Sequence, residues 1–308
     1  MGLLLVRYAE LGLKSEKVRR RFISNLIKDI GSSLMDAKVE HLMTHERGRI
    51  FVETDDVGRA SAVLSTVPGI FSFSEVEPAP SDWDGLMKAL SDYGRTRLKK
   101  GMSYGLKVRR VGTHPYTSHQ AAAEGGGAVM SHLREGDVKV DLSHPDIWFE
   151  VEIRNNRAYL FTTRTKALGG LPSASQGIVL LYLLPLPQDG PFREDMVLRA
   201  HVSHLLMRRR GCKVVPAADV RHLDEWRKVL EVLDPALSKG LTGFEGEPVK
   251  ALQDLMERIG AHGLVHPVPL ELIDRAPLLH DSGAAVASFF PAAVMDRDEM
   301  ERWSKELS

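Results

Sequence analysis

The alternation of hydrophobic and polar residues changes sharply near the middle of the chain. From residue 150 to residue 164, polar and apolar residues alternate on both sides of Asn155-Asn156. This pattern predicts two antiparallel strands joined by a tight turn. Ile178–Leu184 is instead a run of seven apolar residues, which is typical of a strand buried on both faces of a parallel sheet. The glycine- and proline-containing segment Ala167–Pro172 lies between them, so the pattern predicts two architectures joined by a hinge near residue 170.

The first 77 residues show the element order βαββαβ. Leu3–Tyr8 is an apolar strand, and Ser15 can cap a helix that runs to about Ile30. Apolar residues recur four positions apart along one face of this helix; they are Val18, Phe22, Leu26 and Ile30. Strands are predicted at 39–43, 49–53 and 70–76, with a second helix at 56–65. This order is that of a ferredoxin-like domain.

A second domain is predicted over residues 78–170. Pro78 and Pro80 mark its start. Its predicted elements are a helix at 82–100, a strand at 103–110, a helix at 118–134 and a strand at 139–142, followed by the hairpin. Three glycines at 125–127 interrupt the second helix, and each costs roughly 1 kcal/mol relative to alanine. The first two domains together form an α+β half.

Strands and helices alternate after residue 170. Strands are predicted at 178–184, 212–216 and 264–265, and helices at 194–210, 226–233, 249–259 and 298–307. Such alternation predicts a three-layer α/β domain over residues 171–308. Its central strand is expected at 178–184, with 212–216 as the neighbouring strand.

Composition is that of an ordinary globular protein of two or three domains, with 308 residues, 43% of them hydrophobic and 27% charged. No apolar run approaches the roughly 20 residues needed to span a bilayer, and the first six residues are too short for a secretory signal. The single cysteine, Cys212, excludes an internal disulfide and a cysteine-rich zinc site. These features predict a cytoplasmic protein with no membrane partner.

The net charge of zero hides an uneven distribution. Residues 1–170 contain 25 Lys and Arg against 21 Asp and Glu, a net charge of +4, and residues 171–308 contain 16 against 20, a net charge of −4. This asymmetry favours a polyanion as partner of the first half. The alternative is ordinary variation in surface charge.

Candidate RNA-binding residues are concentrated in the second domain. Lys107, Arg109 and Arg110 lie in a predicted strand, and His114 and Tyr116 follow in a loop. Basic side chains contact phosphates, and an aromatic or imidazole ring can stack on an unpaired base. The alternative interpretation is a solvated edge strand.

Further basic candidates lie elsewhere in the first half. They are Lys14, Arg20 and Arg21, for which a solvated helix face is the alternative, and Arg154 at the end of a hairpin strand. The twelve histidines are scattered without a tight pair beside cysteine or carboxylate ligands, so no metal site is expected.

Short motifs occur in a fixed order over residues 1–172. In the first domain they are Val6–Lys14, Arg20–Phe22, Arg47–Arg49 and Val67–Ile70; in the second they are Lys107–Arg110, Val140–Asp146 and Val151–Arg154, followed by Gly169–Pro172. This series resembles the tRNA 4-thiouridine synthetase family, ThiI. The resemblance implies a ferredoxin-like domain at 1–77, a THUMP RNA-binding domain at 78–170 and a PP-loop ATP-pyrophosphatase-like domain at 171–308. Beyond residue 172 it rests on Arg210–Pro216 and Phe290–Asp296.

Two chemical features of the family are missing from the third domain. The family uses an S-G-G-x-D-S loop, in which glycines let backbone N–H groups approach ATP phosphates. The equivalent stretch, Pro185–Phe192, contains three prolines, which have no N–H, and one glycine. The family's sulfur-carrying cysteine has no counterpart at 262–274. Cys212 lies at the start of an apolar predicted strand, where a free cysteine usually serves as a small hydrophobic residue. The sequence therefore predicts a degenerate domain with no bound cofactor and no catalytic residue, and favours a protein that is not an enzyme.

The resemblance implies the tRNA acceptor end as partner, and the family is often dimeric. The hypothesis is a tRNA-binding protein that presents RNA to a separate modification enzyme without adenylating it. The alternative is an active tRNA sulfurtransferase that thiolates uridine 8 through a divergent nucleotide site. A third reading, a structural interaction module, predicts no preference for tRNA over other polyanions.

Overall fold

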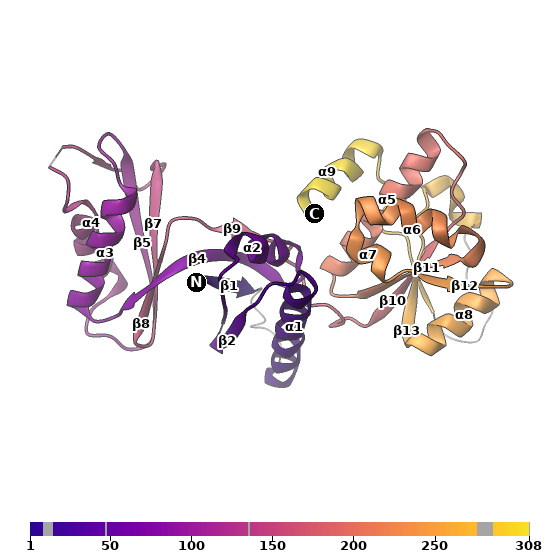
Figure 1. Ribbon diagram of the computed structural model, residues 1–308, viewed down its shortest axis with the longest axis horizontal. Coiled ribbons are helices and arrows are strands. Elements are labelled where there is room, and N and C mark those ends of the chain that lie inside the picture. Colours follow the sequence, from indigo (N-terminus) through magenta and orange to yellow (C-terminus); the bar gives the residue numbers. More distant parts are fainter. Residues whose placement is uncertain (9–14, 47, 135, 276–285, 308) are drawn as a thin grey trace. The chain divides into compact units, whose positions relative to one another are not determined.

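The computed structural model describes residues 1–8, 15–46, 48–134, 136–275 and 286–307 (Figure 1). The chain packs as two units. The first comprises Met1–Arg7, Val39–Ala60 and Ser72–Thr165, and the second comprises Tyr8–Lys38, Ser61–Phe71 and Lys166–Ser308.

One mixed sheet runs through the N-terminal half. Its strands are β1 (Gly2–Tyr8), β2 (Leu42–Glu46), β3 (Arg49–Thr54), β4 (Ile70–Pro80), β5 (Ser103–Val111), β6 (Lys139–Val140), β7 (Ile147–Arg154), β8 (Arg157–Phe161) and β9 (Thr165–Lys166). Their order is β2-β3-β1-β4-β8-β7-β5-β6, with β9 paired to β4. The predicted hairpin is confirmed, because β7 and β8 pair antiparallel across the Asn155-Asn156 turn.

The first helix, α1 (Glu16–Asp36), begins as predicted and ends later. The Ser15 side chain accepts a hydrogen bond from the Val18 N–H, as expected of a cap. The predicted end near Ile30 is wrong by six residues, because Leu34 continues the four-residue apolar spacing and is buried. The second helix, α2 (Val57–Thr66), lies within one residue of its predicted position.

Two strands of this half differ from their predicted limits. β2 begins three residues late, since its pairing with β3 brings Leu42 opposite Glu53. β4 extends four residues beyond the predicted end, and its last residues pair with β8 from Glu77 to Pro80. The domain boundary predicted between residues 77 and 78 therefore falls inside a continuous strand, although the domain limits themselves stay a prediction.

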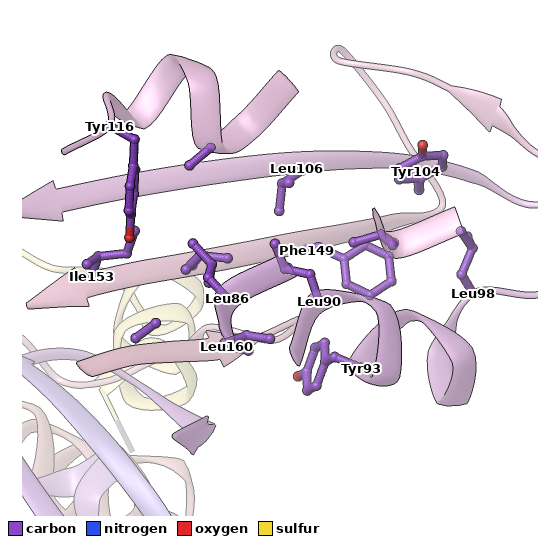
Figure 2. Close-up of a cluster of buried hydrophobic side chains, with 14 residues drawn as sticks. Leu86, Leu90, Tyr93, Leu98, Tyr104, Leu106, Tyr116, Phe149, Ile153 and Leu160 are labelled. Atoms are coloured by element: carbon purple, nitrogen blue, oxygen red, sulfur yellow. The ribbon is translucent and has the colours of Figure 1, made fainter. Parts of the chain in front are cut away.

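Two helices, α3 (Trp83–Arg97) and α4 (Ser118–Met130), cover one face of β5, β7 and β8 (Figure 1). Their contact surface is apolar. In Figure 2, Leu86, Leu90 and Tyr93 of α3 point toward Phe149 and Leu160 of the sheet, and all five side chains are buried. The predicted helices at 82–100 and 118–134 are thus confirmed in place, although α3 ends three residues early and α4 ends four residues early.

Glycines allow these two helices to approach closely. A Cβ atom on Gly94 would lie 2.1 Å from the carbonyl oxygen of Val129, and one on Gly125 would lie 2.8 Å from both Leu106 and Leu90. Within the glycine run that weakens α4 locally, Gly125 is therefore the residue needed where α4 packs against α3 and β5. Tertiary packing and the Thr117–Gln120 capping box offset the low helix propensity.

The second unit contains a five-stranded parallel sheet. Its strands are β10 (Ile178–Leu183), β11 (Lys213–Asp219), β12 (Thr242–Phe244), β13 (Ala261–Val265) and β14 (Ala287–Phe289), in the order β12-β11-β10-β13-β14. All neighbouring pairs are parallel. The central position of β10, with β11 beside it, is as predicted.

Helices cover both faces of this sheet. Val179, Leu181 and Leu183 of β10 pack with α5 (Pro191–Arg209), α6 (Leu223–Leu233) and α7 (Pro235–Lys239). Leu180 and Tyr182 pack on the opposite side with α8 (Pro248–Ile259). The last helix, α9 (Arg297–Leu307), packs against α5. This is the predicted three-layer α/β architecture.

The segment predicted as a hinge is held by backbone hydrogen bonds on both sides. The N–H of Gly169 donates to Ile70 O and its carbonyl accepts from Gly69 N–H, each at 2.7 Å, while Leu171 N–H donates to Arg209 O at 3.0 Å. Gly170 has a φ of +75°, and a Cβ there would lie 2.0 Å from Arg209 O, so glycine is required. The segment is a fixed connection within its unit.

We expect Gly94→Ala to lower the free energy of unfolding by about 1–3 kcal/mol, because its Cβ meets backbone atoms that cannot rotate away. Gly127→Ala is the matched control, since nothing lies within 4 Å of its Cβ position. It should be neutral or stabilise by up to about 1 kcal/mol. Denaturant midpoints of the full chain measure both changes, and equal midpoints for the two variants would contradict the close helix contact.

Candidate nucleic-acid interface

The predicted basic strand divides its side chains between two faces. In β5, Lys107 and Arg109 are exposed on the face opposite the helices, as the alternation of a strand requires. Arg110 lies on the helix-facing side, half-buried, and its Nη1 donates a hydrogen bond to the carbonyl of His114 at 3.3 Å. The three predicted basic residues therefore do not form one surface.

The face with Lys107 and Arg109, here called the outer face, also contains Trp148 of β7. The register places Trp148 beside Gly105, and the Lys107 Nζ lies 3.4 Å from the centroid of the Trp148 ring. Glu150 on the same face is paired with Arg164 at 2.5 Å. The unneutralised exposed charge of this face is thus positive, which suits a phosphate backbone.

Two of the predicted loop residues have structural contacts. Tyr116 is 6% exposed, lies in the apolar cluster of Figure 2 and donates its hydroxyl hydrogen to the carbonyl of Ser81. His114 Nε2 lies 2.7 Å from the carbonyl oxygen of Asn155. The His114 contact holds the β5–α4 loop against the hairpin turn, and the Tyr116 bond holds it against the residues that precede α3. Tyr116 is too buried to stack on a base.

Arg154 is buried in an ion-pair cluster around Glu152. The Glu152 side chain is 3% exposed and lies 3.5 Å from Arg7 Nε, 2.7 Å from Arg49 Nε and 3.0 Å from Arg154 Nη1. Burial lowers the pKa of Arg7 to about 10, and its Nη1 donates to Ser74 Oγ at 3.0 Å. Glu152 therefore links β7 to β1 and β3 through Arg7 and Arg49, whereas Arg154 pairs within β7 and lies 3.7 Å from Glu46 of β2. The burial of Arg154 gives no support to a contact with RNA.

The remaining basic candidates lie outside this sheet. Lys14 falls outside the described residues. Arg20 and Arg21 are exposed on α1, in the second unit, and Arg20 pairs with Glu16 one helical turn away. A solvated helix face and an RNA contact both fit these positions.

A pocket of about 590 Å³ lies in the first unit, between strands of the sheet and α3. Its lining includes four carboxylates, those of Glu46, Glu53, Glu75 and Glu77. Arginines 97 and 157 also line it, but Arg97 is paired with Glu77 at 2.6 Å. The excess of negative charge makes this pocket unsuitable for a phosphate.

In the second unit, the strand order reverses between β10 and β13, where doubly wound sheets bind ligands at the carboxyl ends of the strands. After β10, Arg193 donates to the carbonyl of Pro187 at 2.7 Å and pairs with Glu225. After β13, His266 is 1% exposed and stacks on Phe290, and burial lowers its pKa to about 4. Arg193 is thus paired with a carboxylate, and His266 is neutral at pH 7.

The single cysteine lies in the second unit. Cys212 is buried among apolar side chains, and burial raises the pKa of its thiol, which makes it a poor nucleophile. In the part of the chain that is described, no three His, Cys, Asp or Glu side chains gather as a metal site would require. None of the described helices is both long and apolar enough to cross a membrane.

Comparison with known proteins agrees with the N-terminal architecture. Residues 3–74 match the model of the ThiI ferredoxin-like domain, and residues 81–163 match the THUMP domain. Both domains occur in the order that the sequence motifs indicate. The chain is therefore a THUMP protein of the ThiI-like type, and it belongs to a family of tRNA-modification proteins.

Curated proteins named tRNA sulfurtransferase are similar to most of this chain. A probable tRNA sulfurtransferase of Methanothermobacter thermautotrophicus is 33% identical over 218 residues, which cover 69% of this chain and 51% of the relative. The probable tRNA sulfurtransferase of Methanocaldococcus jannaschii is 32% identical over 272 residues, 83% of this chain and 66% of the relative. The chain thus spans about half the length of several curated relatives it matches.

Two solved structures share the fold. PH1313 from Pyrococcus horikoshii has a TM-score of 0.79 at 22% identity, covering 100% of this chain and 99% of that protein. A 4-thiouridine synthetase solved as an RNA complex with bound ATP has a TM-score of 0.74 at 17% identity, covering 100% of this chain and 85% of that protein. At these identities the likeness concerns the fold alone.

Trp148 and Glu152 are features of the outer face that the sequence patterns do not single out. Glu152 lies in the strand predicted from residue 150, so its face could be derived from periodicity. Trp148 lies two residues before that predicted start, in the part of β7 that extends back to Ile147. The sequence does not reveal that Trp148 lies over Gly105 or that Glu152 pairs with Arg49, because these partners belong to other strands whose register it leaves open.

We expect Glu152→Gln to lower the free energy of unfolding by about 3–5 kcal/mol, because it removes the buried carboxylate shared by the buried Arg7 and Arg154 and the partly buried Arg49. Glu150→Gln, which breaks a more exposed pair with Arg164, is the control and should cost less than about 1 kcal/mol. Urea denaturation of the full chain compares them. A loss at Glu152 no larger than at Glu150 would refute a structural role for the cluster.

Proposed function

We propose that this chain binds tRNA through the outer face of its THUMP sheet. The observation that carries the proposal is the exposure of Lys107 and Arg109 on a THUMP-domain face where Glu150 and Glu152 are already paired with arginines. A net positive strand surface attracts phosphates, and the RNA complex of the 4-thiouridine synthetase of similar fold is consistent with such a partner. The acceptor end of tRNA, implied by the family resemblance, is the proposed region of contact.

Four of the other residues predicted to bind RNA have structural roles in this proposal. Arg110, His114 and Tyr116 support the β5–α4 loop behind the face, and Arg154 fixes β7 within the sheet. Their loss would act through the shape of the domain and not through a phosphate contact.

We further propose that the chain presents tRNA to a separate modification enzyme without adenylating it. The proline-containing loop after β10, the pairing of Arg193 and the burial of Cys212 support this reading. The competing function is ATP-dependent thiolation of tRNA, the activity named for the curated relatives. A cytoplasmic location and a homodimer stay predictions.

Replacement of Lys107 and Arg109 together by alanine should weaken tRNA binding and flatten its dependence on salt. Each lost phosphate contact reduces the slope of log K against log salt by roughly one. Filter binding or fluorescence anisotropy at several salt concentrations measures both quantities. Arg110→Ala is the control: it removes one positive charge from the opposite side of the same strand, and it should leave the slope unchanged. A slope insensitive to the double change, with circular dichroism unaltered, would remove the outer face from the interface.

ATP provides the test that separates presentation from thiolation. A ligand that binds the folded state raises its melting temperature by mass action, so millimolar Mg-ATP should shift any protein that binds it at micromolar affinity. We expect no shift here, with or without tRNA, and no release of AMP and pyrophosphate. A saturable shift that disappears when Gln188, Asp189 and Gly190 are changed would establish a divergent nucleotide site and the competing function.

A further inference from the structure

Trp148 lies flat in the outer face, between a glycine and an ammonium group. On its inner side the ring covers Gly105, where a Cβ atom would come within 2.5 Å of Trp148 Cζ3. On its outer side, the Lys107 Nζ lies 3.4 Å from the ring centroid. The glycine on β5 therefore provides the space that lets the indole of β7 lie across the neighbouring strand.

The cover on the outer side of the ring is easily moved. Lys107 is exposed, and its ammonium sits on a flexible four-carbon chain. Stacking of a base on an aromatic side chain stabilises a complex more than an exposed cation–π contact does. When the ammonium leaves the ring it can pair with a phosphate, so one side-chain movement produces both a stacking surface and an ionic contact.

We propose that Trp148 stacks on an unpaired base of the bound RNA and that Lys107 is its displaceable cover. This inference rests on the proposed tRNA-binding function and adds a base contact to it. Arg109 lies two residues further along the same face of β5, about 6.6 Å away along the strand. It supplies a second cation for the adjoining phosphate. Stacking on the ring is sequence-tolerant, since every base has a π face.

The test uses the full chain and a set of tRNAs, each with one abasic nucleotide at an unpaired position of the acceptor end. An abasic nucleotide removes the stacking partner and keeps the phosphate. In the wild-type protein we expect one position at which base removal weakens binding about tenfold. Trp148→Ala should weaken binding of the intact tRNA by a similar factor and lose its sensitivity to that position. Trp148→Phe, which keeps an aromatic ring, should retain most of both.

Two further variants separate stacking from charge and from folding. Gly105→Ala adds a Cβ that displaces the indole ring from its position over β5, while Trp148 and Lys107 are kept. Binding of tRNA by this variant should therefore lose its sensitivity to base removal, as in Trp148→Ala. Arg109→Ala should reduce the salt slope by about one and keep the sensitivity to base removal. Trp148→Ala should leave the salt slope unchanged.

The outcomes distinguish this inference from the function on which it rests. If Trp148→Ala, folded by circular dichroism, binds tRNA and remains as sensitive as wild type to every abasic position, the stacking role is wrong and tRNA binding stands. If the wild-type chain shows no preference for tRNA over other polyanions, the proposed function fails and the stacking role fails with it.

Discussion

The buried carboxylate of Glu152 holds together the part of the molecule on which the RNA proposal depends. Three guanidinium groups reach it, from β1, β3 and β7, so one side chain links strands that the sequence assigns to two domains. Burying a carboxylate is costly unless its charge is compensated, and Arg7, Arg49 and Arg154 supply that compensation. The outer face of β5 is therefore part of a sheet that runs without interruption from β2 to β6.

This requirement explains why several basic residues of the family-like motifs do not face solvent. Arg49 and Arg154 belong to motifs that resemble an RNA-binding family, yet both are used to neutralise Glu152. The contiguous motif Lys107–Arg110 is likewise divided by strand alternation, which leaves Lys107 and Arg109 on the outer face and turns Arg110 to the helices. A count of basic residues in a motif thus overstates the charge that a phosphate can reach.

The sequence predicted the features that depend on residues close together in the chain. The hairpin around Asn155, the cap at Ser15 and the apolar run of β10 were evident from the sequence, because turn chemistry, capping and periodicity act over a few residues. The sequence did not reveal the end of α1, the start of β2 or the three-residue strands β12 and β14. Pairing and burial against distant segments determine these features. The triple glycine in α4 shows the same limit: the sequence reveals its cost in helix propensity but not the close packing of Gly125 against Leu90 and Leu106. For the site, the basic side of β5 was predictable, whereas the Gly105–Trp148–Lys107 arrangement depends on the parallel register of β5 and β7.

Likeness of fold carries different weight in the two halves of the chain. The strand-order reversal beside β10 marks a common position for ligand binding in parallel sheets. The reversal does not depend on the residues in the loops, so it does not indicate which ligand binds there. Phosphate binding needs N–H groups and cations. Here the loop after β10 contains prolines, and Arg193 in the first turn of α5 is paired with Glu225. RNA binding needs an accessible cationic face, which a sheet provides wherever alternate side chains are basic and their acidic neighbours are neutralised. The outer face of β5 meets that requirement through Lys107 and Arg109, beside the paired carboxylates of Glu150 and Glu152.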